Sequence, residues 1–222
     1  MSQKKILLVE GKGDQEFFQK LCEKIDLSVE VKVNTPQDHG AERNGKPAAL
    51  KLLDTLMAQL ADGRITHLAM VVDADYVEDN WGYEITFQSV VKKIQLHGYI
   101  DSSSQLPGLC FPHPDGFNPF GLWIMPDNRS EGMLEDWLVK AAKEEERYLL
   151  DHAVTTVGKL TTPKFKPIHT RKAEVATWLA WQKTPGAGLD SVIWQDLMNM
   201  RAIPVEHIIQ WLRRIYSPQP HM

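Results

Sequence analysis

The sequence has few of the features that mark secreted or membrane-bound proteins. Its 222 residues include only two cysteines, Cys22 and Cys110, which is too few for a disulfide framework or an all-cysteine zinc site and fits a reducing compartment. Only four apolar residues (6–9) precede Glu10, which is too short for the core of a signal peptide. No later apolar run approaches the roughly 20 residues of a membrane span. The sequence therefore predicts a cytoplasmic protein without a membrane segment.

An excess of positive charge is also missing. The chain has 25 Lys and Arg against 29 Asp and Glu, a formal net charge of -4, which argues against a protein that holds nucleic acid by charge alone. Residues 1–140 contain 14 basic and 21 acidic side chains, residues 141–222 contain 11 and 8, and five basic residues without an acid lie between His152 and Ala173. This asymmetry suits a metal-dependent enzyme acting on a polyanion, although a solvated loop explains the basic run equally well.

The hydrophobic pattern predicts an α/β protein. Hydrophobic residues make up 43% of the chain and charged residues 24%, close to the globular average, which excludes disordered and fibrous classes. Apolar or alternating runs predict strands over residues 5–9, 29–33, 66–72 and 121–125. Helical periodicity predicts intervening helices over residues 14–25, 47–61, 86–96 and 133–150, and later ones over 174–182 and 205–215. The loop-like segment 102–120 is expected to hold short strands.

Strands and helices that alternate in this way predict a mostly parallel sheet with helices on both faces. A length of 222 residues suits one domain with an elaboration. We therefore expect residues 1–150 to form the α/β domain, and residues 151–222 to form a basic segment and a helical extension packed on it.

Acidic side chains follow three of the predicted strands. Glu10 follows the first strand, with Asp14 four residues later, Asp73 and Asp75 follow the third, and several acids between residues 127 and 136 follow the fourth. Ligands of parallel α/β sheets bind beyond the carboxyl ends of the strands, so these acids are expected at one rim. Two acids two residues apart point the same way if the strand geometry continues.

A cluster of carboxylates needs protons or cations. Two unit charges ~4 Å apart repel by about 1–4 kcal/mol at surface-like dielectrics. Oxygen ligands without His or Cys favour Mg²⁺, Mn²⁺ or Ca²⁺ over zinc, and two metals ~3.5–4 Å apart are a common device for phosphodiester displacement. A wet strand end explains any single acid, but Glu10, Asp73 and Asp75 together favour a metal site.

Other phosphate-handling motifs fail at particular residues. Gly11 and Gly13 match the start of a dinucleotide-binding fingerprint, but Glu16 occupies its third glycine position and Asp14 would repel a pyrophosphate. No Walker A pattern is present, which excludes an autonomous P-loop ATPase. The acidic pair that begins at Asp73 follows the third strand, whereas a haloacid-dehalogenase-type phosphatase carries its pair after the first.

Two segments resemble the TOPRIM domain, the catalytic module of topoisomerases, primases and OLD-type nucleases. They are residues 6–14 (ILLVEGKGD) and residues 70–75 (MVVDAD). Within that superfamily the chain is most similar to small stand-alone proteins of the DUF3226 type, on residues 125–128 (MPDN), 132–136 (GMLED) and 172–186. The matches extend from residue 5 to about residue 188, and the resemblance implies a TOPRIM-like fold.

The resemblance implies a role for each matching acid. Glu10 matches the acid that serves as metal ligand or general acid/base, and Asp14 matches an extra acid of OLD-type nucleases. Asp73 and Asp75 match the metal-binding pair. The ligand of a second metal is either Glu131 or Glu135, of which we take Glu135 into the predicted set.

Basic residues complete the implied site. Lys172 matches the lysine that OLD-type nucleases place near the scissile phosphate, and it follows the acid-free basic segment. Auxiliary contacts to the substrate are expected from the basic residues before it, Lys164, Lys166 and Arg171.

The sequence thus predicts a metal-dependent phosphodiesterase, most simply a nuclease acting on DNA or RNA with Mg²⁺ or Mn²⁺. The chain carries no topoisomerase tyrosine domain, primase zinc module or ABC ATPase, so any ATPase would be a separate partner protein. The alternative is a non-catalytic TOPRIM-fold subunit that binds a metal or nucleotide within a larger complex, for example a phage-defence system. The predicted metal ligands are Glu10, Asp14, Asp73, Asp75 and Glu135, with Glu10 and Lys172 as catalytic residues.

Overall fold

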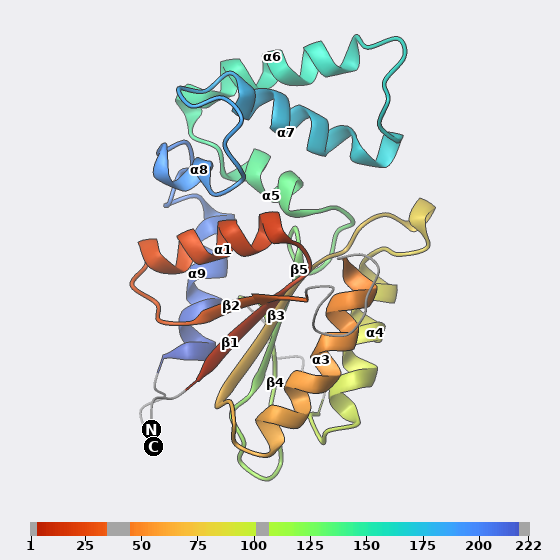
Figure 1. Ribbon diagram of the computed structural model, residues 1–222, viewed down its shortest axis with the longest axis vertical. Helices are drawn as coiled ribbons and strands as arrows, with labels where there is room; N and C mark the ends of the chain where they lie inside the picture. Colours follow the sequence, from red (N-terminus) through yellow and green to blue (C-terminus); the bar gives the residue numbers. More distant parts are fainter. Residues whose placement is uncertain (1–3, 35–44, 101–106, 218–222) are drawn as a thin grey trace.

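A five-stranded sheet lies at the centre of the protein (Figure 1). The computed structural model describes residues 4–34, 45–100 and 107–217. The strands are β1 (Lys5–Val9), β2 (Glu30–Val33), β3 (His67–Asp73), β4 (Leu109–Phe111) and β5 (Phe120–Met125). Their order is β2-β1-β3-β5-β4, in which only β4 runs antiparallel to its neighbour. In these described ranges, the predicted α/β class and mostly parallel sheet are confirmed.

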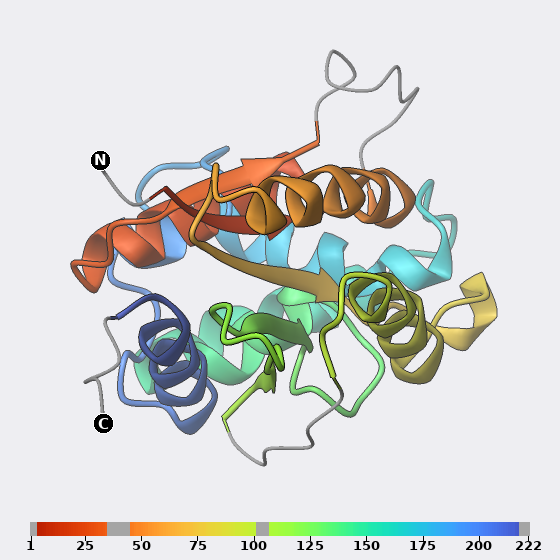
Figure 2. The ribbon, with the colours of Figure 1, turned by 90° about the horizontal axis from the view of Figure 1, so that it is seen from below.

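Helices cover both faces of the sheet. They are α1 (Lys12–Lys24), α3 (Lys46–Ala61), α4 (Tyr83–Gln95), α5 (Leu134–Ala141), α6 (Arg147–Gly158), α7 (Thr170–Ala180), α8 (Ser191–Trp194) and α9 (Ile203–Tyr216), with short 3₁₀ turns η1 (Val77–Asp79), η2 (Glu144–Glu146) and η3 (Pro167–His169). Figures 1 and 2 show α9 to the left of the sheet and α4 to its right. Helices α6 and α7 pack as a pair beyond α5, at the top of Figure 1.

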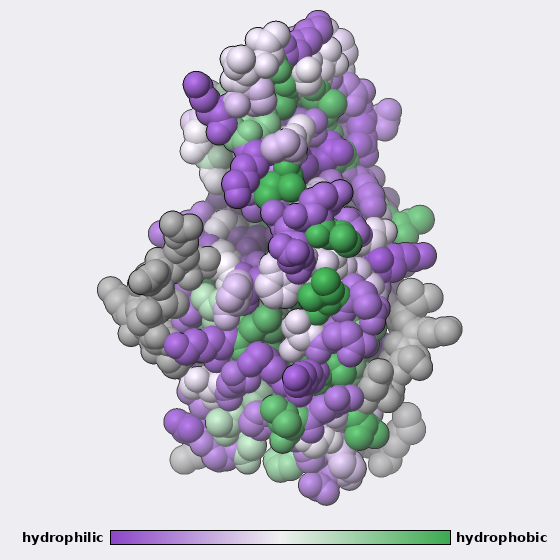
Figure 3. Space-filling model, turned by 90° about the vertical axis from the view of Figure 1, so that its right-hand side faces the viewer, coloured by the Kyte–Doolittle hydropathy of each residue, from purple (hydrophilic) through white to green (hydrophobic). Residues whose placement is uncertain are grey.

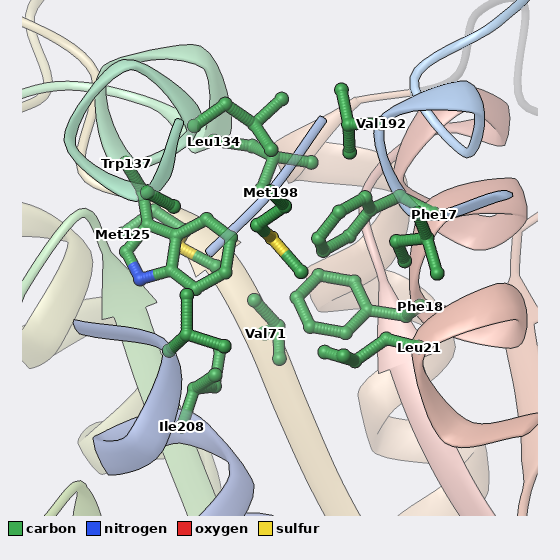
Figure 4. Close-up of a cluster of buried hydrophobic side chains, with 14 of the residues drawn as sticks. Phe17, Phe18, Leu21, Val71, Met125, Leu134, Trp137, Val192, Met198 and Ile208 are labelled. Carbon is green, nitrogen blue, oxygen red and sulfur yellow. The ribbon is translucent and has the colours of Figure 1, made fainter. Parts of the chain in front are cut away.

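Alternate residues of the central strands enter two separate cores. In β1, Leu7 and Val9 join the core under α1, α5 and α9, whereas Ile6 and Leu8 join the core under α3 and α4. All four side chains are buried, because a parallel strand with helices on both faces has no solvated side. Figure 4 shows the first core, in which α1 contributes aromatic rings opposite the rings of α5.

The C-terminal helix α9 is hydrogen-bonded to strands β1 and β4 of the sheet. The hydroxyl of Tyr216 donates to the carbonyl of Ile6 (2.6 Å), and Lys5 Nζ donates to the carbonyl of Tyr216 (2.6 Å). Trp211 Nε1 donates to the carbonyl of Leu109 (3.1 Å). The expected C-terminal helix packed on the sheet is therefore confirmed, while the domain boundary at residue 150 stays a prediction.

The expected single helix over residues 133–150 is wrong. Helix α5 ends at Ala141, the backbone of Ala142 is extended (φ -59°, ψ 143°), and α6 begins at Arg147. The N–H of Lys143 donates to the carbonyl of Leu197 (3.0 Å), within a bridge to the segment after α8. Apolar periodicity continues through this break, so the sequence pattern does not reveal it.

Two expected segments extend beyond the residues that the structure describes. The polar stretch before α3 includes residues 35–44, and the predicted loop 102–120 includes residues 102–106, all outside the described ranges. The described remainder of that loop contains the short strand β4, as expected. None of the helices in the described ranges combines the length and the apolar character needed to cross a bilayer, and Figure 3 shows polar residues interspersed with single apolar ones on the face it presents.

Candidate metal centre

Acidic side chains gather where two central strands end and two helices begin. Glu10 directly follows β1, and Asp73 is the last residue of β3, which pairs with β1 in parallel. Asp14 lies in the first turn of α1, and Glu135 lies in the first turn of α5. Glu10, Asp14 and Asp73 line one small recess. The edge of the sheet that the sequence pattern predicts for these acids is thus where they lie.

Three of these carboxylates are oriented by main-chain N–H groups. Glu10 Oε1 accepts a hydrogen bond from the N–H of Asp73 (2.8 Å), and Asp73 Oδ1 accepts one from the N–H of Leu134 (2.9 Å). Asp14 Oδ2 accepts one from the N–H of Gly11 (2.9 Å). The second oxygen of each carboxylate takes no hydrogen bond from the described part of the chain. One oxygen of each side chain is therefore fixed by the main chain.

The N-termini of α1 and α5 explain why these residues fold in this way. The first N–H groups of a helix have no partner inside the helix, and a carboxylate is favoured beside them. Gly11, in extended conformation, caps α1 and is bonded by the side chain of Asp14. The N–H of Leu134, the first residue of α5, donates a hydrogen bond to Asp73 at the end of β3. The helix ends thus bring acids from separate segments together.

Burial and mutual repulsion disfavour the charged forms of these acids. Burial is the main reason that the pKa of Glu10 rises to about 8, and the charges of Asp75 and Asp14 add to the shift. Lys46 and the hydrogen bond from Asp73 oppose it. Burial also raises the pKa of Asp14 to about 6. The charged forms of these carboxylates are therefore destabilised in the recess, and a bound cation would stabilise them.

The same electrostatic coupling includes Asp73, Glu135 and Lys172. Burial raises the pKa of Asp73 well above its usual range, and the charge of Glu135 is among those that add to it. Burial also raises the pKa of Glu135, against the opposing charge of Lys172. Desolvation works to lower the pKa of Lys172, but nearby carboxylates, led by Glu135 and Asp73, outweigh it and raise the pKa. Lys172 is therefore a persistent cation beside the cluster.

Asp75 is turned out of line with Asp73. Strand β3 ends at Asp73, and Asp75 has a left-handed backbone (φ 58°) that exchanges two hydrogen bonds with Gly132 (2.9 and 3.1 Å). Its Oδ2 lies 2.7 Å from Lys46 Nζ. The strand geometry that would aim both acids the same way therefore ends two residues before Asp75.

Lys46 is a residue of this site that the sequence pattern does not reveal. It begins α3, and its residue surface is only 3% exposed. A lysine next to Pro47 at the start of a helix ordinarily extends its charge into water, so neither periodicity nor charge assigns Lys46 to the interior. The one available signal is its position after a long polar stretch and before a strongly apolar helix.

The basic residues expected to bind the substrate lie in different surroundings. Lys164 and Lys166 are exposed in the connection between α6 and α7. Arg171 is already paired within the chain, with Nε 3.0 Å from Asp136 Oδ1 and a terminal nitrogen 2.6 Å from Glu174 Oε2. Lys172 is coupled electrostatically to the carboxylate cluster, most strongly to Glu135 and Asp73.

Of the two late acids, the structure brings Glu135 to the cluster. Glu135 influences the ionisation of Asp14, Asp73 and Lys172. Glu131 is exposed, and its Oε2 accepts a long hydrogen bond (3.4 Å) from the N–H of the first residue of η1.

An open groove of about 610 Å³ is lined by sequence neighbours of the cluster, among them Tyr76, Asp136 and Arg171. One wall comes from Tyr76 and the η1 turn, and the other from η3 and the start of α7, including Lys166 and Arg171. The hydroxyl of Tyr76 donates to Asp136 Oδ2 (3.0 Å), so Asp136 ties the loop after β3 to Arg171 of α7.

The side chains suit Mg²⁺ or Mn²⁺ chemically but are not arranged as a finished cage. Among residues 4–34, 45–100 and 107–217, no three His, Cys, Asp or Glu side chains already form a group that holds a metal ion. The donors lining the recess are carboxylate oxygens, which hard cations prefer.

A family model covers nearly the entire chain. It is described as "Protein of unknown function (DUF3226)" and matches residues 4–217. Comparisons with curated proteins and with solved structures found no match. The matched range includes every acid of the cluster together with Lys46 and Lys172. The chain therefore belongs to the DUF3226 family.

Proposed function

We propose that this protein is a metal-dependent phosphodiesterase, a nuclease of TOPRIM type related to the OLD-type enzymes, that acts with Mg²⁺ or Mn²⁺. The observation that carries the proposal is the recess at the ends of β1 and β3, where Glu10, Asp14 and Asp73 converge beside Glu135 and Lys172. A bound divalent cation supplies Lewis-acid activation of a phosphodiester and of water.

The protein side chains divide the remaining tasks. Glu10 lines the recess, where it would hold the cation or, as the TOPRIM resemblance implies, donate or accept a proton. Lys172 places a positive charge where a phosphate develops additional negative charge. Lys164 and Lys166, exposed between α6 and α7, suit contacts to the backbone of DNA or RNA.

Cleavage by the purified full chain tests the proposal. Supercoiled plasmid and single-stranded RNA are incubated with Mn²⁺, with Mg²⁺ and with EDTA. We expect cleavage of at least one substrate with metal, none in EDTA, and none by Asp73→Asn with metal. Asp26→Asn is a matched control, because Asp26 is exposed with a left-handed backbone (φ 55°) that asparagine adopts readily. Cleavage by Asp73→Asn at the wild-type rate would disprove the assignment of the site.

An exposed row of rings favours a second candidate, a non-catalytic subunit of a larger complex. Tyr148 is 82% exposed and Trp181 is 40% exposed. The ring of His152 lies between them, with centroids 6.4 Å from Tyr148 and 5.4 Å from Trp181. Exposed aromatic side chains are common in protein interfaces, and a separate ATPase would be one such partner. Absence of metal-dependent cleavage on every substrate would favour this candidate.

A further inference from the structure

The ammonium group of Lys46 is fully engaged inside the protein. Lys46 Nζ lies 2.7 Å from Asp75 Oδ2 and donates to the carbonyl of Ala74 and to Thr86 Oγ1, both at 3.1 Å. It also lies 4.4 Å from the ring centroid of Trp81. An ammonium has three N–H donors, and each has an oxygen partner here. With its side chain 2% exposed, Lys46 is a fixed part of the interior.

This fixed charge stands beside the carboxylate recess. Asp75 follows the last residue of β3 by two positions, and the charge of Lys46 reaches Glu10, whose ionisation it favours. Glu10, Asp14 and Asp73 line the recess, whereas Asp75 does not. The ammonium of Lys46 is thus paired with Asp75, which the sequence pattern would assign as a metal ligand.

We propose that the ammonium of Lys46 is a built-in cation that neutralises Asp75, so that the cluster takes up one divalent metal ion at Glu10, Asp14 and Asp73 instead of a pair. This inference rests on the proposed function and specifies its metal stoichiometry. A second metal at Asp75 would lie beside an ammonium that has no route to solvent, and two neighbouring cations repel. Lys46 is accordingly a positioning residue, since it acts through Asp75.

Titration of the full chain with Mn²⁺, followed by calorimetry and by the EPR signal of free Mn²⁺, tests the inference without an activity assay. The wild type should bind one ion. Lys46→Met, which keeps an apolar chain against Trp81, should bind two, because Asp75 is released. Lys46→Met combined with Asp75→Asn should bind one ion again, with an affinity close to that of the wild type. Lys93→Met is the matched control, because Lys93 pairs with Asp54 on the surface, and it should bind one ion.

The outcomes separate this inference from the proposed function. Two ions in the wild type, or one ion in Lys46→Met, would overturn the role of Lys46 and leave a metal-dependent enzyme standing. No ion in the wild type would overturn the metal centre itself. If Lys46→Met does not fold, the double variant decides, because it removes both charges of the pair together. An affinity about tenfold or more below wild type in the double variant would identify Asp75 as a ligand and overturn the inference.

Discussion

Replacing Glu10 by Gln should make the metal-free protein less sensitive to rising pH. Gln keeps the size of the side chain and an oxygen that can accept the N–H of Asp73, but it cannot ionise. Burial raises the pKa of Glu10 from 4.5 to about 8, so the unfolded chain releases this proton at a lower pH than the folded chain. The stabilisation from neutral Glu10 is complete below pH ~4.5 and is lost as the pH rises to ~8.

The size of this effect follows from the shift. At 1.36 kcal/mol for each pKa unit, the rise from 4.5 to about 8 costs at most about 5 kcal/mol of folding stability. Between pH 5 and pH 7 the linkage relation gives about 2–3 kcal/mol. One kcal/mol shifts the melting temperature of a chain this long by about 2–4 °C, so Glu10 should lower it by about 5–10 °C across that interval.

Thermal melts in EDTA at pH 5, 6, 7 and 8 measure the difference. As the pH rises, the melting temperature of Glu10→Gln should fall less than that of the wild type. In a parallel series with Mg²⁺ in place of EDTA, the fall should become smaller for the wild type but not for Glu10→Gln. Glu16→Gln is the control, because Glu16 is exposed on α1, the helix that follows Glu10, and it should follow the wild type. An equal fall for Glu10→Gln and the wild type, or a lower melting temperature for Glu10→Gln at pH 8, would refute the reasoning.

Three further variants separate the roles of other residues. Asp73→Asn should lose cleavage but keep or raise the melting temperature in EDTA, because its amide oxygen can still accept the N–H of Leu134 while one repelling charge is removed. Lys172→Ala should lose cleavage yet bind Mn²⁺ like the wild type in a titration, and the slope of log affinity for nucleic acid against log salt should fall by ~0.7–0.9. Arg171→Ala should lower the melting temperature measured by circular dichroism, because Arg171 pairs with Asp136 inside the chain.

For each of these variants, one experimental outcome would contradict the prediction. A substantially lower melting temperature for Asp73→Asn would mean that its charge supports the fold. Normal cleavage by Lys172→Ala would leave Lys172 as a solvated charge, and loss of Mn²⁺ binding would make it a support of the fold. Lys183→Ala is the matched control for Lys172→Ala and should cleave like the wild type, because Lys183 is exposed just beyond the C-terminal end of α7. If Arg171→Ala keeps the wild-type melting temperature but binds nucleic acid more weakly, Arg171 contacts the substrate, as the sequence predicts.

The position of the candidate site could be predicted from sequence because it depends on local patterns. Residues 6–9 and 68–72 are apolar throughout, as is typical of strands that are covered on both faces. Parallel strands end at the same edge of a sheet, so Glu10 and Asp73 were expected at one edge once both strands were assigned. That they are neighbours there depends also on the pairing of β1 with β3, which local patterns do not predict.

The finer arrangement depends on partners that are distant in sequence. The break after Ala141 comes from pairing with the segment after α8, and the orientation of Asp75 comes from Gly132 and Lys46. None of these partners is marked by periodicity, because each contact joins residues from separate elements. A pattern of acids alone therefore predicts where charge gathers but not which acid is already neutralised by the chain.

The neighbours Arg171 and Lys172 show the same limit within one helix. In the sequence they form a single basic pair and suggest one clamp for a substrate. Successive residues of an α-helix point about 100° apart, so the two side chains of α7 leave the helix in different directions. Arg171 reaches Asp136 and fastens α7 to α5, whereas Lys172 acts on the carboxylates at the recess. One residue of the pair thus holds the scaffold in place and the other brings charge to the site, and removing each should affect a different measurement.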